Sequence, residues 1–290
     1  MISIVVISKD EPALDETLAD VVAHAGGLVE ETEVVVVDAS QRRLDHVRRA
    51  HPGVRWVDYA VPPGVAVSIP HQRNAGVAAA EGEIVVFTDA GCRPREGWLP
   101  RLVAPLLAGE ETVTTGIATS PGGGGLYDSR VARTAEAVHV PECPTINMAF
   151  RRGAFDAVGG FDESFQYGSD IDFSWRLVDA GHRIRSVADS VVTHDWGTSG
   201  RQLRRGYRYG RARARLYRKH AHRLPRALRE DPMVVVYPLF LLGLPLALRH
   251  RSYLALLLVP AWRNRADGPV RVVADHLVFG LGVLREVARR

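Results

Sequence analysis

The stretch Glu83-Ile-Val-Val-Phe-Thr-Asp89-Ala-Gly91 is an apolar run that ends on a carboxylate and a glycine. Its β-branched and aromatic residues predict a strand buried on both faces, because a half-exposed strand would alternate apolar with polar residues. Two similar runs precede it, Ile2 to Ser8 and Val34-Val-Val-Val-Asp38. Helix-forming segments separate these strands, so we expect an α/β fold in which helices sandwich a mostly parallel, Rossmann-like sheet.

The alternation of helices and strands continues toward residue 200. Helical spacing of apolar residues and short β-branched runs are the signals for these assignments. We expect helices at residues 14–25, 44–50, 71–80, 151–158 and 171–180, and strands at 54–59, 184–187 and 190–194. The run Pro121-Gly-Gly-Gly-Gly125 lacks the Lys-Ser/Thr pair of a phosphate-binding loop, so we interpret it as a surface loop or a mobile lid.

Polar residues follow three of the predicted strands, at Ser8-Lys-Asp10, Asp38-Ala-Ser40 and Asp89. Ligands of such sheets bind beyond the carboxyl ends of the strands, so we expect these residues to share one crevice. A carboxylate there costs solvation free energy unless it meets a cation, and a divalent metal that carries a diphosphate would suit Asp89. An equally weighted alternative is that Asp89 is a solvated loop carboxylate or the N-cap of a helix at residues 95–102.

Composition excludes several classes of protein. The chain is 46% hydrophobic and 24% charged, as expected of a folded globular protein and not of a disordered one. Cys92 and Cys143 are too few and too far apart for a disulfide framework or a structural zinc site. The formal net charge of +4 conceals a basic strip between Arg201 and Arg229 that has twelve basic residues and no acidic one, so the other residues are net acidic.

The C-terminal part begins with a basic helix from Arg201 and ends with an amphipathic helix over Val270 to Arg290. Between them lie two apolar stretches, Met233 to Leu248 and Tyr253 to Trp262. Prolines interrupt both, and each is shorter than the ~20 residues that span a bilayer as a helix. We therefore expect an interfacial hairpin or the face of a homodimer, and no single clean transmembrane helix.

The segment Met1 to Asp10 has no basic region before its short apolar run, so it predicts a strand and not a signal peptide. We expect a cytoplasmic protein. Arginine-rich strips bind diphosphates, anionic membranes or nucleic acids. Because apolar stretches follow the strip at once, we favour peripheral binding at the inner face of the membrane over nucleic acid.

Further motifs follow in a fixed order. Gln72-Arg73-Asn74-Ala-Gly76 precedes the strand at residues 83–89, and Gly159-Gly-Phe-Asp-Glu163 precedes Tyr167-Gly-Ser-Asp170-Ile-Asp-Phe-Ser-Trp-Arg176. The ordered set resembles the family-2 glycosyltransferases of the GT-A fold over about residues 1 to 215. The resemblance implies a catalytic domain at 1–215, with a nucleotide-sugar half at 1–100 and an acceptor half at 101–215, and a helical, partly apolar extension at 216–290.

The resemblance implies an inverting, metal-dependent enzyme that moves one sugar from a nucleotide-diphosphate sugar to an acceptor hydroxyl. Asp170 matches the general base of the family. Asp89 and His194 match positions close to a divalent cation, Mn²⁺ or Mg²⁺, although a histidine at a strand end is otherwise more often structural. The residues that the resemblance places near the donor are Ser8, Asp10, Asp38, Arg73, Asn74, Thr88, Asp89, Trp175 and Arg176.

Two positions depart from the family pattern. Gly91 stands where a second metal-binding acid is common, and Ser169 stands where Glu usually precedes the base. A single carboxylate is compatible with Mg²⁺ in a nucleotide site, and Mn²⁺ suits a mixed oxygen and nitrogen site better. Asp172 begins the helix that follows, so a role as an N-terminal dipole and cap residue is at least as well supported as a catalytic one.

Three other functions compete with single glycosyl transfer. The two missing acids favour a degenerate sugar-nucleotide or anion-binding module. A nucleotidyltransferase ranks lower, since residues 8–12 lack the expected glycine-rich loop. Processive polysaccharide synthesis is not expected, because Arg201 to Tyr209 lacks the Trp of the Gln-x-x-Arg-Trp motif.

Residues 194–211 and the apolar tail also resemble the glycosyltransferases of mycofactocin maturation, which would make the acceptor a modified peptide.

Overall fold

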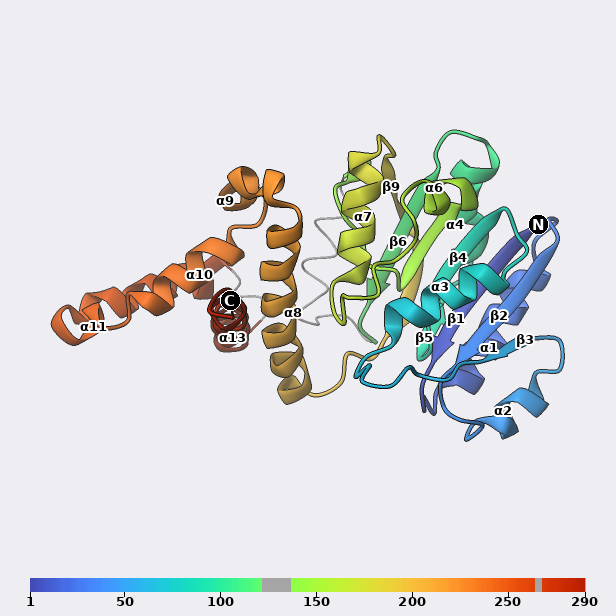
Figure 1. The fold of residues 1–290 in the computed structure, drawn as a ribbon, viewed down its shortest axis with the longest axis horizontal. Helices are drawn as coiled ribbons and strands as arrows, with labels where there is room; N and C mark the ends of the chain where they lie inside the picture. The colour runs from blue at the N-terminus through green and yellow to red at the C-terminus, as the bar shows by residue number, and fades with distance from the viewer. Residues whose placement is uncertain (122–136, 264–267, 290) are drawn as a thin grey trace. The chain divides into compact units, whose positions relative to one another are not determined.

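The chain forms two compact units in the computed structural model, which describes residues 1–121, 137–263 and 268–289 (Figure 1). The first unit ends at Asp195 and the second begins at Trp196. Residue 215, the expected end of the catalytic domain, falls inside helix α8 (Ser199–Lys219), which belongs to the second unit. The reason is packing, since α8 lies along α13 (Pro269–Val287) in the second unit.

A single mixed sheet forms the first unit. Its strand order is β3-β2-β1-β4-β8-β6-β9-β5, with β7 paired to β9. The strands are β1 Ile2–Ser8, β2 Thr32–Asp38, β3 Arg55–Asp58, β4 Ile84–Asp89, β5 Cys92–Pro94, β6 Val113–Thr119, β7 His139–Val140, β8 Asn147–Arg151 and β9 Ile184–His194. Strands β1 to β4 are parallel, which confirms the prediction for this half of the sheet.

The other half of the sheet differs from the prediction. Strand β8 was not predicted, and it pairs antiparallel with both β4 and β6, which places a reversed strand in the middle of the sheet. The two strands expected at 184–187 and 190–194 are one strand, β9. Its pairing with β6 shifts between Thr115 and Ile117, where Ser186 and Val191 are their partners. The polar break in the sequence is thus a bulge and not a strand end.

Helices cover both faces of the sheet. Helices α3, α6 and α7 lie in front of it in Figure 1 and share one core with the strands, to which Val77, Ala154 and Phe173 contribute. Helices α1 and α4 pack against each other and against the strands, and their buried residues include Leu18 and Leu102. The helices of this unit are α1 Leu14–Gly26, α2 Asp45–Ala50, α3 Ile69–Ala79, α4 Trp98–Leu107, α6 Arg152–Ala157 and α7 Ser169–Asp179.

The expected loop at 121–125 lies, beyond Pro121, outside the described residues. Helix α6 begins at Arg152, one residue later than expected, because Arg151 still pairs with Ile84 in the sheet. Helix α3 begins two residues earlier than expected, with Pro70 in its first turn, where a missing N–H costs no hydrogen bond.

The second unit is helical. Its elements are α8, η1 Ala221–Arg226, α9 Ala227–Glu230, α10 Met233–Leu242, α11 Leu246–Arg249, η2 Arg251–Leu257, α12 Leu258–Arg263 and α13. Helix α13 packs on both α8 and α10. Gly210 of α8 permits the approach, because a Cβ at that position would lie 2.0 Å from the carbonyl oxygen of Phe279. Within the described part of the chain, none of the helices combines the length and the hydropathy needed to cross a bilayer.

Candidate active site

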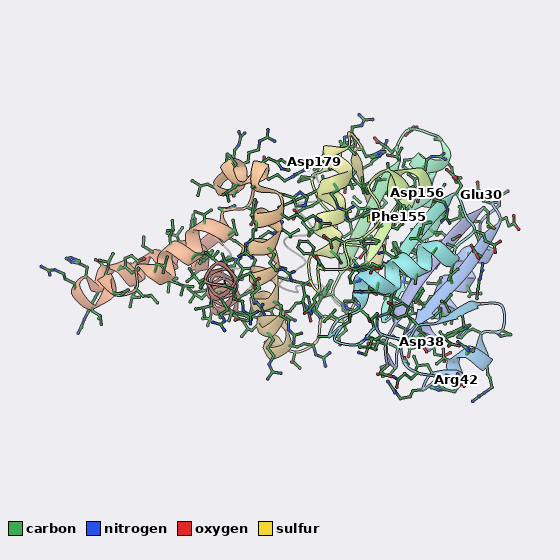
Figure 2. The ribbon with its side chains drawn as sticks, viewed as in Figure 1. Glu30, Asp38, Arg42, Phe155, Asp156 and Asp179 are labelled. Carbon is green, nitrogen blue, oxygen red and sulfur yellow. The ribbon has the colours of Figure 1, made fainter. Side chains whose placement is uncertain are left out.

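A cavity of about 190 Å³ opens at the carboxyl ends of β1 and β4. Figure 2 labels Glu30, which lies just before β2, and Asp38, the last residue of β2. Asp38 therefore marks the edge of the sheet where the strands have their carboxyl ends. Three of the predicted residues line the cavity. Its polar lining residues are Ser8, Lys9, Glu11, Gln72, Arg73 and Asp89. The crevice expected from the parallel strands is therefore present where β1 and β4 end.

Three buried polar atoms at this edge have no hydrogen-bond partner among the residues with described positions. They are the hydroxyl oxygens of Ser8 and Thr88 and the Nε of Arg73. Buried polar groups in folded proteins nearly always have a partner, and exceptions call for an explanation. A bound polar ligand would explain Ser8 and Arg73, because both line the cavity.

Asp170, Arg73 and Asp89 form an interacting group of charges. The Arg73 Nη2 lies 3.6 Å from Asp89 Oδ1, and its guanidinium stands 5.6 Å from the ring centroid of Phe161. Burial raises the pKa of Asp170 above its ordinary value, Arg73 opposes this increase, and Asp89 adds to it. An aspartate whose pKa is raised is a stronger base, which suits it to accept a proton.

Asp170 is held by the start of α7. The residue before the helix, Gly168, has a φ of 81°, which glycine adopts without strain, and α7 begins at Ser169. The Asp170 Oδ1 accepts a 2.9 Å hydrogen bond from the N–H of Ile171. Gly168 and not Asp172 is therefore the N-cap residue. Asp172 lies in the first turn of α7, where its carboxylate favours the helix dipole, so the dipole part of the expectation is confirmed and the capping part is wrong.

His194 lies beside the turn that follows Asp89. Strands β5 and β9 place Cys92 opposite His194, with 3.7 Å between the Cys92 Sγ and the His194 Nδ1. Burial raises the pKa of Cys92 to about 12, so this residue stays a neutral thiol and not a thiolate ligand. A Cβ built on Gly91 would lie 3.6 Å from His194 Cε1. The structure thus brings His194 next to the Asp89-Ala-Gly91 turn.

Ser40 joins Asp10, in the loop after β1, to Asp38, the last residue of β2. The Asp10 N–H donates to Ser40 Oγ at 2.7 Å, and the Ser40 N–H donates to Asp38 Oδ1 at 3.0 Å. The Asp10 carboxylate is exposed and pairs with Arg43 at 2.7 Å, which lowers the pKa of Asp10. Asp38 is buried at the end of β2. These acids lie at the predicted edge of the sheet but do not line the cavity itself.

Asn74 bonds to the loop before α7 instead of the cavity. Its Nδ2 donates to the carbonyl of Phe161 and to Glu163 Oε1, both at 2.9 Å. Its Oδ1 accepts from the N–H of Phe161, also at 2.9 Å. Asn74 therefore fixes the loop at 159–163 on helix α3, beside Arg73.

Trp175 and Arg176 also make their described contacts away from the cavity. The Trp175 Nε1 donates to Glu142 Oε2 at 2.8 Å. Arg176 donates to Asp172 Oδ2 at 2.8 Å and to the carbonyl of Gly160 at 2.6 Å. Both residues thus hold the surroundings of α7, and neither lines the cavity.

The sequence of this region identifies the family. Residues 3–161 match the profile described as glycosyl transferase family 2. The chain belongs to this family. The prediction of a family-2 glycosyltransferase is therefore confirmed, and the match includes the cavity and the strands that bear it.

Relatives of this glycosyl transferase family 2 chain extend the comparison. A pre-mycofactocin glycosyltransferase from Mycobacterium tuberculosis is 31% identical over an alignment of 212 positions, which covers 64% of this chain and 43% of the relative. Glycosyltransferase AglE from Haloferax volcanii is 27% identical over 154 residues, half of each chain. The chain spans about half the length of the curated relatives it matches. The narrower likeness to mycofactocin-type enzymes is thus confirmed as a likeness.

A solved structure supports the fold. The mannosyltransferase PcManGT from Pyrobaculum calidifontis, in complex with GDP-Man and Mn²⁺, matches with a TM-score of 0.71 and 18% identity. The match covers all of this chain and 88% of that one. At this identity the likeness is evidence of the fold alone, and it confirms the GT-A architecture with a helical C-terminal part.

The residues present fit a divalent cation and a diphosphate. The Asp89 side chain is one-third exposed at the cavity, and His194 stands beside the same turn. A carboxylate with an imidazole suits Mn²⁺ better than Mg²⁺. Arg73 provides the fixed positive charge that a diphosphate needs.

Three polar residues that line the cavity were not predicted, namely Lys9, Glu11 and Gln72. Lys9 and Glu11 lie in the same strand-end segment as Ser8 and Asp10, so including every polar residue of that segment would have found them. Gln72 belongs to the quoted Gln72-to-Gly76 motif. Its amide oxygen accepts from Ser68 Oγ at 2.9 Å, and its amide nitrogen donates to the carbonyls of Ser8 at 3.0 Å and Val37 at 3.1 Å. No signal in the sequence shows that its side chain reaches the cavity.

Proposed function

We propose that this protein transfers one sugar from a nucleotide-diphosphate sugar to an acceptor hydroxyl with inversion, and that Asp170 is the general base. The interaction of Asp170 with Arg73 and Asp89 carries the proposal, because it joins a carboxylate of raised pKa to a cationic anion-binding site. Family membership supports the reaction class.

The residues divide the reaction between them. Asp170 accepts the proton of the acceptor hydroxyl while that oxygen bonds to the anomeric carbon, and the bond from this carbon to the diphosphate breaks on the opposite face. Arg73 offsets the charge that gathers on the leaving diphosphate. Asp89 and His194 would hold a divalent cation, which would supply further Lewis-acid stabilisation of that leaving group.

We assign donor binding to the cavity edge and give other residues a positioning role. Ser8 and Arg73 line the cavity with unsatisfied polar atoms, and Thr88 offers a third at the same edge. Asp10 and Asp38 extend this edge toward the nucleoside. Asn74, Trp175 and Arg176, expected to touch the donor, instead hold the loop and the helix that present Asp170.

Replacement of Asp170 tests the proposal. Purified protein with Mn²⁺ and a panel of sugar nucleotides should show donor turnover and protection against thermal unfolding. Asp170→Asn should slow turnover by about 10²–10⁴-fold, the usual contribution of a general base, and should keep donor-induced protection. Asp156→Asn, an exposed carboxylate on α6, is the matched control.

Each alternative has its own outcome. A wild-type protein that binds sugar nucleotides without turnover would support the degenerate binding module. A protein that binds no sugar nucleotide at millimolar concentration would exclude both. Release of diphosphate from a nucleoside triphosphate in the presence of a sugar phosphate would indicate a nucleotidyltransferase.

We also propose that the second unit lies on the anionic inner face of a membrane. The support is its exposed apolar surface, to which Leu242, Leu258 and Trp262 contribute. Arg249 and Arg251 lie between these apolar helices, and no acidic residue occurs from 232 to 265. A homodimer through this surface is the competing outcome.

A further inference from the structure

The space beside Gly91 has an unusual border. The φ of Gly91 is 89°, a conformation that residues with a side chain rarely adopt. An aspartate at this position would therefore be strained, which gives a physical reason for the missing second acid. A Cβ built there would have three nearest neighbours: His194 Cε1 at 3.6 Å, His194 Nδ1 at 3.7 Å and the Glu11 carboxyl carbon at 4.0 Å.

The Glu11 carboxylate thus faces the place that an acid at position 91 would fill. Glu11 comes from the loop after β1, and it lines the same cavity as Asp89. Among the described residues, its carboxylate accepts one hydrogen bond, a 3.3 Å bond from the Ala13 N–H to Oε1. The carboxylate is therefore weakly held by the protein and has lone pairs to offer a ligand.

Independent observations indicate that the cavity receives a polar ligand. The Oγ of Ser8 and the Nε of Arg73 line it, and both are buried without a partner in the described chain. Both residues are less than one-tenth exposed, at 3% and 6%. In the proposed function this cavity would receive two ligands of opposite charge, the cation and the diphosphate.

We propose that Glu11 is a third protein ligand of the divalent cation, and that it replaces the acid that Gly91 cannot supply. This inference rests on the proposed function. With Glu11, the protein offers two carboxylates and one imidazole from three separate segments, the loop after β1, the end of β4 and the end of β9. Such a mixed oxygen and nitrogen set suits Mn²⁺.

Mn²⁺ binding itself provides the test. The electron paramagnetic resonance signal of free Mn²⁺ would be titrated with the whole chain, with and without GDP or UDP. Glu11→Gln keeps the oxygen that accepts from Ala13 but removes the charge, and it should weaken Mn²⁺ binding at least about tenfold, as lesser outer-shell changes already do. Glu11→Asp should give an intermediate value if the carboxylate is the ligand.

Glu31→Gln is the matched control. Glu31 is an exposed residue just before β2, at the amino edge of the sheet opposite the cavity, and its replacement should leave Mn²⁺ affinity unchanged. Circular dichroism would confirm that each variant is folded. Wild-type affinity in Glu11→Gln, or no Mn²⁺ binding by the wild type, would overturn the inference. If Glu11→Gln loses Mn²⁺ while Asp170→Asn keeps full turnover, the proposed base fails and the metal ligand stands.

Discussion

At the residue scale, Asp170 sits in surroundings that oppose its ionisation. Burial and the neighbouring Asp89 raise its pKa, and Arg73 only partly opposes them. Because the pKa is higher in the folded than in the unfolded chain, the contribution of Asp170 to stability is fully present below the unfolded pKa. That contribution is lost as the pH rises through the folded pKa. The ionised carboxylate that the proposed role as a base requires therefore destabilises the fold at neutral pH.

The variant Asp170→Asn should therefore become more stable relative to the wild type as the pH rises. Its amide cannot ionise, so it should melt close to the wild type near pH 3, below the ordinary aspartate pKa of about 3.9, and above the wild type at about pH 8. Calorimetric melting temperatures across this range provide the measurement, with Asp156→Asn as the exposed control. A variant that melts below the wild type at pH 8 would show that Arg73 outweighs burial.

The candidate site was predictable where chemistry follows directly from strand ends. Ser8 and Asp89 end two buried strands, and both line the cavity. Arg176 was predicted to lie near the donor, but its bonds to Asp172 and Gly160 depend on how the loop before α7 folds back on the helix. Glu11 was missed because only the distance between its carboxyl group and Gly91 relates it to the proposed metal site.

At the element scale, the amide of Asn147 joins three segments of the first unit. Its Oδ1 accepts from Trp98 Nε1 at 2.8 Å, and its Nδ2 donates to the carbonyls of Ile117 at 3.1 Å and Ser190 at 3.0 Å. Ile117 and Ser190 flank the register shift between β6 and β9. The side chain of Asn147 thus satisfies backbone groups that the bulge removes from the ladder.

Asn147→Ala should destabilise the first unit substantially. It would leave the buried Trp98 N–H and two carbonyls without this partner, at a cost of roughly 2–4 kcal/mol in the free energy of unfolding. Urea unfolding would show a lower midpoint with an unchanged slope. Arg185→Ala removes a surface ion pair with Glu110 and should cost less than about 1 kcal/mol. Equal losses in the two variants would contradict this role for Asn147.

The same bulge shows why half of the sheet escaped prediction. Strands β1, β2 and β4 are continuous apolar runs, so their own residues reveal them. Strand β8 has five residues and begins with the polar Asn147, whose partners lie 30 to 49 positions away along the chain. Such a strand exists because of pairing with β4 and β6, and a local pattern carries no information about that pairing.

At the scale of the whole molecule, part of the basic strip at residues 201–229 forms ion pairs within the second unit. Arg211 pairs with the buried Glu286 at 2.8 Å, and Arg213 pairs with Asp231 at 3.0 Å. These arginines hold α8 to α13 and to the segment before α10. The strip is therefore less available to lipids or diphosphates than its sequence predicts, and Arg249 and Arg251 become the better candidates for lipid contact.

The proposed membrane contact should consequently depend on the apolar helices and on anionic lipid. Three apolar residues of these helices are largely exposed: Leu242 at 64%, Leu258 at 67% and Trp262 at 69%. Full burial of such a side chain is worth about 1.5–3 kcal/mol, so replacing all three by serine should weaken vesicle binding at least about tenfold, even if burial in lipid is partial. The whole chain should sediment with phosphatidylglycerol vesicles and less with phosphatidylcholine vesicles, because Arg249 and Arg251 favour an anionic surface.

Val29→Ser is the control for that experiment, since Val29 is fully exposed in the first unit between α1 and β2. It should bind vesicles as the wild type does. A wild-type chain that stays in the supernatant with both lipids would refute the membrane contact. Sedimentation velocity would then test the competing homodimer. A concentration-dependent dimer that the triple serine variant abolishes would show that the apolar helices bind a second copy of the chain instead of lipid.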